Sequence, residues 1–258
     1  MADDDGGAGV DPAFRADVLA GLKTRPRAIP ARWFYDLKGS ELFEEITDLP
    51  EYYPTRVERG LLETVSGEVG KAIGAGRAVI EFGSGSSAKT PLLLQAIRPA
   101  SYVPIDISGE FLRESADALS ADFPDLPVYP VEADFTHRVD LPDEVVDTPK
   151  LGFFPGSTIG NFIPPSAVDF LRAMKETLGT GAMLLIGMDR IKDEETLVRA
   201  YDDEAGVTAA FNLNLIARIN RELGGTMPLD AFRHKAVWND NLARIEMHIE
   251  AVRDVDFT

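Results

Sequence analysis

Residues 78–90 read AVIEFGSGSSAKT, and this stretch decides the fold class. Its first five residues are apolar apart from one glutamate, which is typical of a short strand buried on both faces. The strand is predicted to end at Gly83. A helix is predicted to start near Thr90, with Pro91 in the first turn, where proline is tolerated. A buried strand, a glycine-rich turn and a helix form the first unit of a parallel α/β sheet.

Further short apolar runs alternate with helical patterns after this unit. They predict strands over 102–107, 127–133, 151–155 and 182–188. Helices near 110–121 and 165–178 separate most of these strands. Such alternation predicts a parallel sheet with helices on both faces, so we expect an α/β fold with a doubly wound sheet.

The residues before this unit follow a different pattern. Residues 1–12 are acidic and polar, the opposite of a signal peptide, and we predict a disordered tail there. Residues 13–73 have a helical pattern. Within them, Thr55 and Glu58 have the spacing of a capping box, in which each side chain satisfies a free backbone amide at the start of a helix. The apolar face expected for that helix consists of Val57, Leu61, Leu62, Val65 and Val69.

The alternation of strands and helices stops after residue 189. Residues 193–224 have a helical pattern with regularly spaced apolar anchors. Residues 245–250, IEMHIE, alternate apolar and polar side chains with a period of two. That period predicts an exposed antiparallel strand.

The composition excludes several classes of protein. The chain has 258 residues, and 26 Lys and Arg against 43 Asp and Glu give a formal net charge of −17, so we predict no nucleic-acid partner. The absence of cysteine excludes disulfides, thiolate catalysis and Cys-zinc sites. His137, His234 and His248 lack metal-ligand spacing, and no metal is predicted. No apolar run approaches the roughly 20 residues of a membrane span. We therefore expect a cytoplasmic protein without a membrane partner.

The glycine-rich turn is compatible with three kinds of ligand. As a phosphate-binding P-loop it lacks a required glycine, because Ala88 stands in that position. As a dinucleotide-binding turn it fits G-x-G-x-x-A, and Asp106 follows Gly85 by 21 residues, where a ribose-binding acid belongs. However, Glu81 lies inside the end of the strand. Its carboxylate would oppose a pyrophosphate and would suit a ligand with a positive centre.

The third ligand is S-adenosylmethionine, which carries a sulfonium, an α-amino group and a ribose but no phosphate. A bent turn at Gly83 and Gly85 lets the backbone approach the methionyl portion. Asp106, at the end of the second strand, can accept from both ribose hydroxyls. Asp134, at the end of the third, can accept from the adenine amino group while Phe135 packs against the ring. Acids at three successive strand ends favour S-adenosylmethionine over NAD, although each could also be an ordinary polar residue at a strand terminus.

Several long stretches also resemble one protein family. The chain is similar to the S-adenosylmethionine-dependent histidine Nα-methyltransferases of ergothioneine biosynthesis, over essentially its whole length from about residue 15. The stretches that carry the resemblance are WFYD (33–36), GSELF (39–43), LPEYYPTR (49–56), EFGSGSSAKT (81–90), GSTIGN (156–161), RAYDD (199–203) and AGVTAAFN (205–212). The YYPTR and GSTIGN segments are long and unusual, so the resemblance is specific.

The resemblance implies a class I methyltransferase-like doubly wound sheet over residues 74–190, which carries the cofactor. A second, α+β substrate-binding domain would be built from residues 13–73 and 191–258 and would cover an amino-acid pocket. The cofactor roles that the resemblance assigns fall on Gly83, Lys89, Asp106, Asp134 and Phe135.

The same resemblance implies a substrate pocket lined by polar side chains. Gly156, Asn161 and Tyr201 would surround the amino and carboxylate groups of the substrate. Tyr35 would lie near the amine and Tyr52 near the substrate side chain. Methyl transfer is an in-line displacement, so the amine must be held neutral and close to the sulfonium. Tyr35 and Asn161 are the candidate catalytic residues, and neither a metal nor a strong general base is expected.

We therefore expect S-adenosylmethionine-dependent methylation of the α-amino group of an amino acid, with L-histidine as the substrate and trimethylhistidine (hercynine) as the product. The family continues for several tens of residues, with strands that complete the core and groups that contact the imidazole. The C-terminal strands of the core are accordingly expected to be missing, which would leave an open sheet edge. A methyltransferase for a different small amine and a non-catalytic S-adenosylmethionine-binding remnant are the alternatives.

Overall fold

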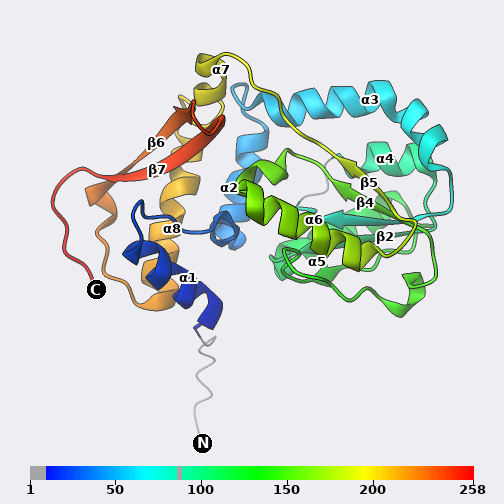
Figure 1. Cartoon of the computed structure of the whole chain (residues 1–258), viewed down its shortest axis with the longest axis horizontal. Helices are drawn as coiled ribbons and strands as arrows, with labels where there is room; N and C mark the ends of the chain where they lie inside the picture. Colours follow the sequence, from blue (N-terminus) through cyan, green and yellow to red (C-terminus); the bar gives the residue numbers. More distant parts are fainter. Residues whose placement is uncertain (1–9, 86–88) are drawn as a thin grey trace, which may run out of the picture.

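The computed structural model describes residues 10–85 and 89–258, which form two lobes (Figure 1). One lobe is a parallel sheet with helices on both faces, and the other combines helices with a two-stranded hairpin. Residues 1–9 of the predicted tail lie outside the described part of the chain. Within the described ranges, no helix is both long and apolar enough to cross a membrane.

The sheet contains parallel strands in the order β3-β2-β1-β4-β5. Their bounds are Ala78–Phe82 for β1, Ser101–Asp106 for β2, Val131–Glu132 for β3, Lys150–Phe154 for β4 and Met183–Ile186 for β5. The first five strands of the common dinucleotide-binding arrangement have this order, and ligands bind there beyond the carboxyl ends of the strands. The prediction of a doubly wound α/β sheet is confirmed, and β1 has the predicted bounds.

The third strand is much shorter than the prediction of 127–133. Residues 131–132 pair with β2, and one isolated bridge involves Val128. Pro127 and Pro130 interrupt this segment, and proline has no amide hydrogen to donate to a strand ladder. β3 is consequently a short strand at one edge of the sheet.

Helices cover both faces of the sheet (Figure 1). The bounds of the helices are Tyr53–Ile73 for α3, Thr90–Ile97 for α4, Gly109–Asp122 for α5 and Pro164–Leu178 for α6. Alternate residues of β1 divide between two cores. Val79 packs in the cluster that includes α3, α4 and α5, whereas Ile80 packs in the cluster that includes α6. Burial on both faces explains why β1 is an almost continuous apolar run.

Apolar side chains are exposed near the other edge of the sheet. Among the described strands, β5 pairs with β4 alone. Leu184 in β5 is 39% exposed, and Met188 and Ile191, which follow it, are 66% and 70% exposed. Val57 and Leu61 of α3 were expected on a buried helix face but are 59% and 57% exposed.

The second lobe is built from both ends of the chain (Figure 1). Its elements are α1 (Pro12–Lys23), α2 (Leu37–Thr47), α7 (Glu194–Arg199), α8 (Val207–Leu223), β6 (Phe232–Asn239) and β7 (Arg244–Ala251). Short 3-10 helices occur at Ala31–Phe34 (η1), Asp143–Val145 (η2), Thr158–Asn161 (η3) and Leu229–Ala231 (η4). α1 starts at Pro12, inside the predicted tail, because Asp11 caps it by accepting from the amides of Ala13 and Phe14.

Two features of this lobe differ from the sequence prediction. The helical stretch 193–224 is divided into α7 and α8, and the Asp203 carboxylate accepts from the amides of Val207 and Thr208 in the first turn of α8. The antiparallel strand predicted at 245–250 is confirmed as β7, but its partner β6 was not predicted.

The predicted capping box at Thr55 and Glu58 is wrong. α3 starts earlier, at Tyr53, and its N-cap residue Tyr52 makes no side-chain capping bond. Thr55 therefore lies inside the first turn. The Glu58 carboxylate is bonded outside the helix, to the loops at the carboxyl end of the sheet.

α3 and α4 approach each other closely at Gly70, where an added Cβ would lie 2.7 Å from the carbonyl oxygen of Ala96. Gly70→Ala should lower the free energy of unfolding by about 1–3 kcal/mol, because the clash outweighs the better helix propensity of alanine. Gly67→Ala is the matched control on the same helix, with nothing within 4 Å of the added Cβ. It should raise the free energy of unfolding by up to about 1 kcal/mol. Urea denaturation followed by circular dichroism measures both, and equal stability of the two variants would contradict this packing.

Candidate active site

The turn after β1 forms a backbone cradle at the carboxyl end of the sheet. Gly83 and Gly85 have φ angles of +69° and +50°, in the left-handed region that favours glycine. The Gly83 amide donates to the carbonyl of Ile105 at 2.8 Å, and a Cβ on Gly83 would lie 3.1 Å from the ring of Phe135. The fold therefore brings these predicted cofactor residues together. Ala88, which decided the P-loop comparison, lies outside the described residues.

Asp106 ends β2 and faces the same cradle. Its Oδ2 accepts from the Gly85 amide at 3.1 Å and its Oδ1 accepts from the Ser108 amide at 3.0 Å. Burial raises the pKa of this carboxyl above its ordinary value, and the backbone hydrogen bonds limit the rise. Asp106 is thus fixed in orientation beside the glycine turn, as a hydroxyl-binding acid should be.

Glu81 is buried beneath the turn, with 2% of its surface exposed. Its Oε2 accepts from the hydroxyls of Thr90 and Tyr102, each at 2.6 Å. Burial raises the pKa of Glu81 from 4.5 to about 7, against the effect of those two hydrogen bonds. The carboxylate thus links β1 to β2 and to the start of α4.

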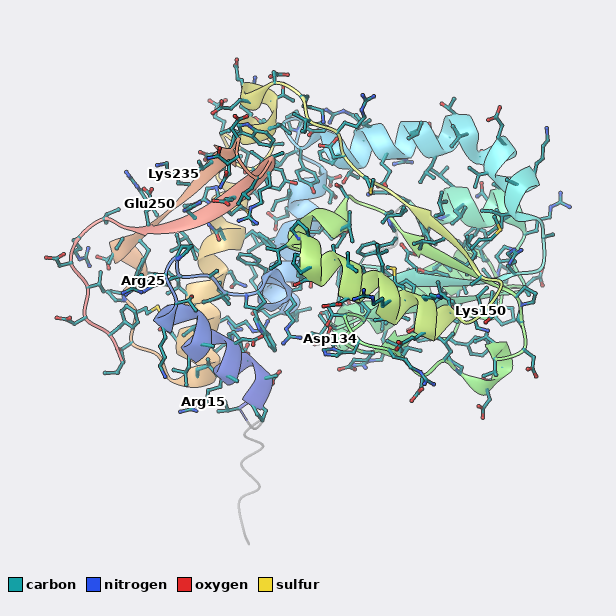
Figure 2. The ribbon with its side chains drawn as sticks, viewed as in Figure 1. Arg15, Arg25, Asp134, Lys150, Lys235 and Glu250 are labelled. Carbon is teal, nitrogen blue, oxygen red and sulfur yellow. The ribbon has the colours of Figure 1, made fainter. Side chains whose placement is uncertain are left out.

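Asp134 follows β3 and faces the second lobe (Figure 2). Its Oδ1 accepts from the amide and the hydroxyl of Thr136 at 3.0 and 2.6 Å, and its Oδ2 pairs with the guanidinium of Arg32 in η1. Burial raises the pKa of Asp134, but the Thr136 hydrogen bonds and the Arg32 charge outweigh it and hold the pKa below its ordinary value. Arg32 also pairs with Asp17 of α1 at 2.8 Å. The predicted adenine-binding acid is therefore tied to the second lobe.

Lys89, at the start of α4, is held by a residue that the sequence did not predict for the site. Its Nζ lies 2.5 Å from Oε2 of Glu58, and the same carboxylate accepts from the Gly156 amide after β4. Sequence spacing had paired Glu58 with a neighbour in its own helix. No local sequence pattern could have predicted the actual partners of Glu58, because they lie in loops far away in the sequence.

A small pocket lies just beyond the end of β4. Its lining includes every residue that the resemblance assigns to the substrate: Tyr35, Tyr52, Gly156, Asn161 and Tyr201. These residues come from the N-terminal segment, from the loop after β4 and from the segment after α7. The structure thus assembles the predicted substrate residues in one place.

Tyr52 is buried in this pocket, Tyr35 and Tyr201 are half-buried, and all three are neutral. Burial raises the pKa of Tyr35, and burial together with neighbouring tyrosines raises the pKa of Tyr52. Burial also raises the pKa of Tyr201, although a hydrogen bond from Tyr52 opposes the rise. The rings of Tyr52 and Tyr201 meet edge to face with centroids 5.8 Å apart. None of these hydroxyls is an anion at neutral pH.

The pocket also has lining residues that the sequence analysis did not assign to it. They are Phe43, Ile46, Ser157, Thr158, Thr208, Phe211 and Met247. Phe43 and Phe211 each contact the Tyr35 ring edge to face, with centroids 5.6 Å apart. Both phenylalanines lie in the stretches that carry the family resemblance, which is the signal that could have found them. Met247 belongs to β7, and its position depends on how the hairpin docks.

A larger cavity adjoins this pocket, between the β6–β7 hairpin and α8. It shares Ser157, Asn161, Tyr201 and Met247 with the small pocket but lacks Tyr35 and Tyr52. Of the two, the small pocket alone combines all the predicted substrate residues beside the strand ends. Across the described ranges, no three acidic or histidine side chains are grouped to hold a metal ion.

A doubly wound sheet with a glycine turn, strand-end acids and an adjoining pocket lined by tyrosines and an asparagine fits a protein of the S-adenosylmethionine-dependent methyltransferase class. The model of the family described as "Histidine-specific methyltransferase, SAM-dependent" matches residues 14–258. The chain therefore belongs to this family.

Individual relatives agree with the family assignment. The chain is 46% identical over 243 residues to a histidine N-alpha-methyltransferase of Mycolicibacterium smegmatis, covering 93% of this chain and 75% of that one. It is 44% identical over 244 residues to a protein of the same name from Mycobacterium tuberculosis, with the same coverage. It is 32% identical over 210 residues to ergothioneine biosynthesis protein 1 of Neurospora crassa, covering 79% of this chain and 24% of that one.

The residues at the cradle fit the cofactor of this family. Ser84 is 7% exposed, and its hydroxyl has no hydrogen-bond partner within the described part of the chain. A buried polar atom without a partner is costly unless a ligand satisfies it. The Gly83 position is open to a ligand because it carries no side chain, and Asp106 offers two oxygens beside it.

Gly83→Ala should weaken binding of S-adenosylhomocysteine at least about tenfold, because the methyl group meets Phe135 and the positive φ is strained. Gly76→Ala is the matched control. Gly76 has a φ of +80° with nothing within 4 Å of an added Cβ. Both variants therefore strain the backbone, but only Gly83→Ala adds a clash. Isothermal titration calorimetry should give wild-type affinity for Gly76→Ala. Equal affinities for the two variants would remove Gly83 from the cofactor site.

The raised pKa of Glu81 predicts that the stability of the fold depends on pH. The pKa of Glu81 is about 7 in the folded protein and 4.5 ordinarily. Between pH 4.5 and pH 7 the folded protein therefore binds a proton at Glu81 that the unfolded chain does not bind. The stability that this proton contributes is lost as the pH rises through this range. Glu81→Gln removes the titration. The unfolding free energy of the wild type relative to Glu81→Gln should fall by roughly 2–3 kcal/mol between pH 5 and pH 8.

Urea unfolding at several pH values measures this difference. Glu63→Gln, which changes an exposed glutamate on α3, should show no such dependence. A constant difference between wild type and Glu81→Gln across the range would contradict a raised pKa.

Proposed function

We propose that this chain methylates the α-amino group of L-histidine with S-adenosylmethionine as the methyl donor, giving trimethylhistidine (hercynine) in ergothioneine synthesis. The observation that carries the proposal is the pocket beyond β4, where Tyr35, Asn161 and Tyr201 meet beside the cofactor cradle. The names of the mycobacterial relatives support histidine as the amino acid.

Two parts of the chain, divided as the sequence predicts, would perform different tasks. Residues 74–190 would bind the cofactor, and residues 13–73 together with 191–258 would form the domain that covers the amino acid. The ion pair between Arg32 and Asp134 joins these parts directly. The substrate pocket is lined from both of them, which supports this division.

When bound, S-adenosylmethionine supplies an electrophilic methyl group on a sulfonium. The backbone of the Gly83–Gly85 turn and Lys89 would hold its methionyl portion, and Asp106 would hold the ribose. Asp134 would accept from the adenine amino group, with Phe135 against the ring. Phe135 packs edge to face on Phe154, with centroids 6.2 Å apart, and this contact supports its ring.

The substrate residues would orient an amine rather than deprotonate it. Tyr35 keeps its proton at neutral pH because burial raises its pKa, so its hydroxyl can hydrogen-bond the amine without becoming a base. Asn161 and Tyr201 can bind the substrate carboxylate without adding positive charge to the pocket. The amine would lose its proton to water, and proximity to the methyl group would supply most of the rate.

This mechanism predicts how the rate depends on pH. kcat/KM for histidine should rise with pH as the free amine loses its proton, with a midpoint set by the substrate. Tyr35→Phe should lower kcat about tenfold or more through loss of orientation, while the midpoint stays unchanged. A steady-state pH profile of both proteins measures this. Loss of the rising limb in Tyr35→Phe would instead identify Tyr35 as the base.

Mass spectrometry of the reaction products tests the proposed function. Purified protein with S-adenosylmethionine and L-histidine should give mono-, di- and trimethylated histidine. Histamine, which lacks the carboxylate that Asn161 and Tyr201 would bind, should be methylated far more slowly. Cofactor binding with no methylated histidine would favour a different amine substrate or a non-catalytic remnant. Absence of cofactor binding by folded protein would contradict the proposal altogether.

A further inference from the structure

Glu58 extends from α3 into the space between three loops at the carboxyl end of the sheet. Its Oε1 and Oε2 accept from the Gly156 amide at 3.0 and 2.8 Å, and Oε2 lies 2.5 Å from Nζ of Lys89. Gly187, just after β5, lies so close that a Cβ there would be 1.8 Å from Oε1 of Glu58. A single carboxylate therefore contacts the loops after β1, β4 and β5.

This carboxylate differs from the surface ion pairs of the same helix. The side chains of Glu58 and Lys89 are 16% and 14% exposed, whereas those of Glu63 and Arg59 on α3 are 55% and 62% exposed. Exposed pairs contribute little and hold no fixed geometry. A largely buried pair that also accepts from a backbone amide is fixed in geometry, and removal of one partner leaves the other charge uncompensated.

The two groups that Glu58 holds belong to different halves of the site. Lys89 is a predicted cofactor residue at the end of the glycine turn, and Gly156 lines the substrate pocket. Gly156 has a φ of +83°, in the left-handed region that favours glycine, and its amide is held by the hydrogen bonds to Glu58. Its Cα is also near Lys89, because a Cβ on Gly156 would lie 3.6 Å from Nζ.

We propose that Glu58 is a positioning residue that couples the cofactor loop to the substrate pocket. This inference rests on the proposed function. A ligand that orders Lys89 orders the carboxylate paired with it, and the carboxylate in turn fixes the Gly156 peptide at the substrate pocket. Either ligand then binds better when the other is present, since a coupling free energy between two sites is reciprocal.

Calorimetric titration with S-adenosylhomocysteine, with and without saturating histidine, measures this coupling. In the wild type, histidine should increase the affinity for S-adenosylhomocysteine about fivefold or more. Glu58→Gln keeps the side-chain length but turns either an uncharged oxygen or an NH₂ group toward Lys89. It should reduce the coupling factor toward one and lower kcat/KM for histidine about tenfold or more. Glu63→Gln, the same change at an exposed position of α3, should retain the wild-type coupling.

Gly187→Ala tests the same carboxylate without removing its charge. The added methyl group occupies the position of Oε1 and must displace Glu58. Loss of coupling is expected here too, and this variant decides the question if circular dichroism shows that Glu58→Gln does not fold.

Retention of the wild-type coupling factor in Glu58→Gln would overturn the inference. Equal weakening of both ligands with an intact coupling factor would also overturn it, because a purely structural role predicts that result. If the wild-type protein methylates histidine but shows a coupling factor of one, the positioning role is contradicted and the proposed function is not. A wild-type protein that binds no S-adenosylhomocysteine contradicts the proposed function itself.

Discussion

Parallel pairing of β1 with both β2 and β4 is the constraint on which the site depends. Phe82 is in register with Ile105, and Glu81 with Phe153, so three strands end at the same edge of the sheet. The residues that follow these strands are therefore brought together although they lie far apart in the sequence. The second lobe contacts this edge through the ion pair of Arg32 with Asp134, and Glu58 of α3 bonds the loops after β1 and β4.

The electrostatic character of the pocket follows from what surrounds it. Phe43 and Phe211 pack around Tyr35, and burial in such surroundings disfavours the charged form of a phenol. Neutral hydroxyls and an amide can bind an amino acid without competing for the positive centre of the methyl donor. The charged groups, Lys89 and Glu58, are paired with each other beside the pocket. This division of neutral and charged groups suits transfer of a methyl group to an uncharged amine.

Local sequence patterns predicted those parts of the fold that depend on neighbouring residues. The run AVIEF followed by glycine defines β1 and its turn, and Asp106 and Asp134 were found because strand ends can be located from apolar runs. Local sequence patterns gave wrong predictions where contacts between distant parts of the chain determine the structure. Glu58 has capping-box spacing with Thr55, yet its partners lie 31 and 98 residues away. The substrate residues are also far apart in sequence, and the family resemblance rather than periodicity identified them.

A crystal structure of the protein with S-adenosylhomocysteine and L-histidine would locate both ligands in one measurement. The adenosine should lie beside Asp106 and Phe135, and the histidine amine should lie in the pocket lined by Tyr35, Asn161 and Tyr201, facing the cofactor sulfur. Histidine bound in the larger cavity beneath the β6–β7 hairpin, or a cofactor bound away from the Gly83–Gly85 turn, would contradict this arrangement.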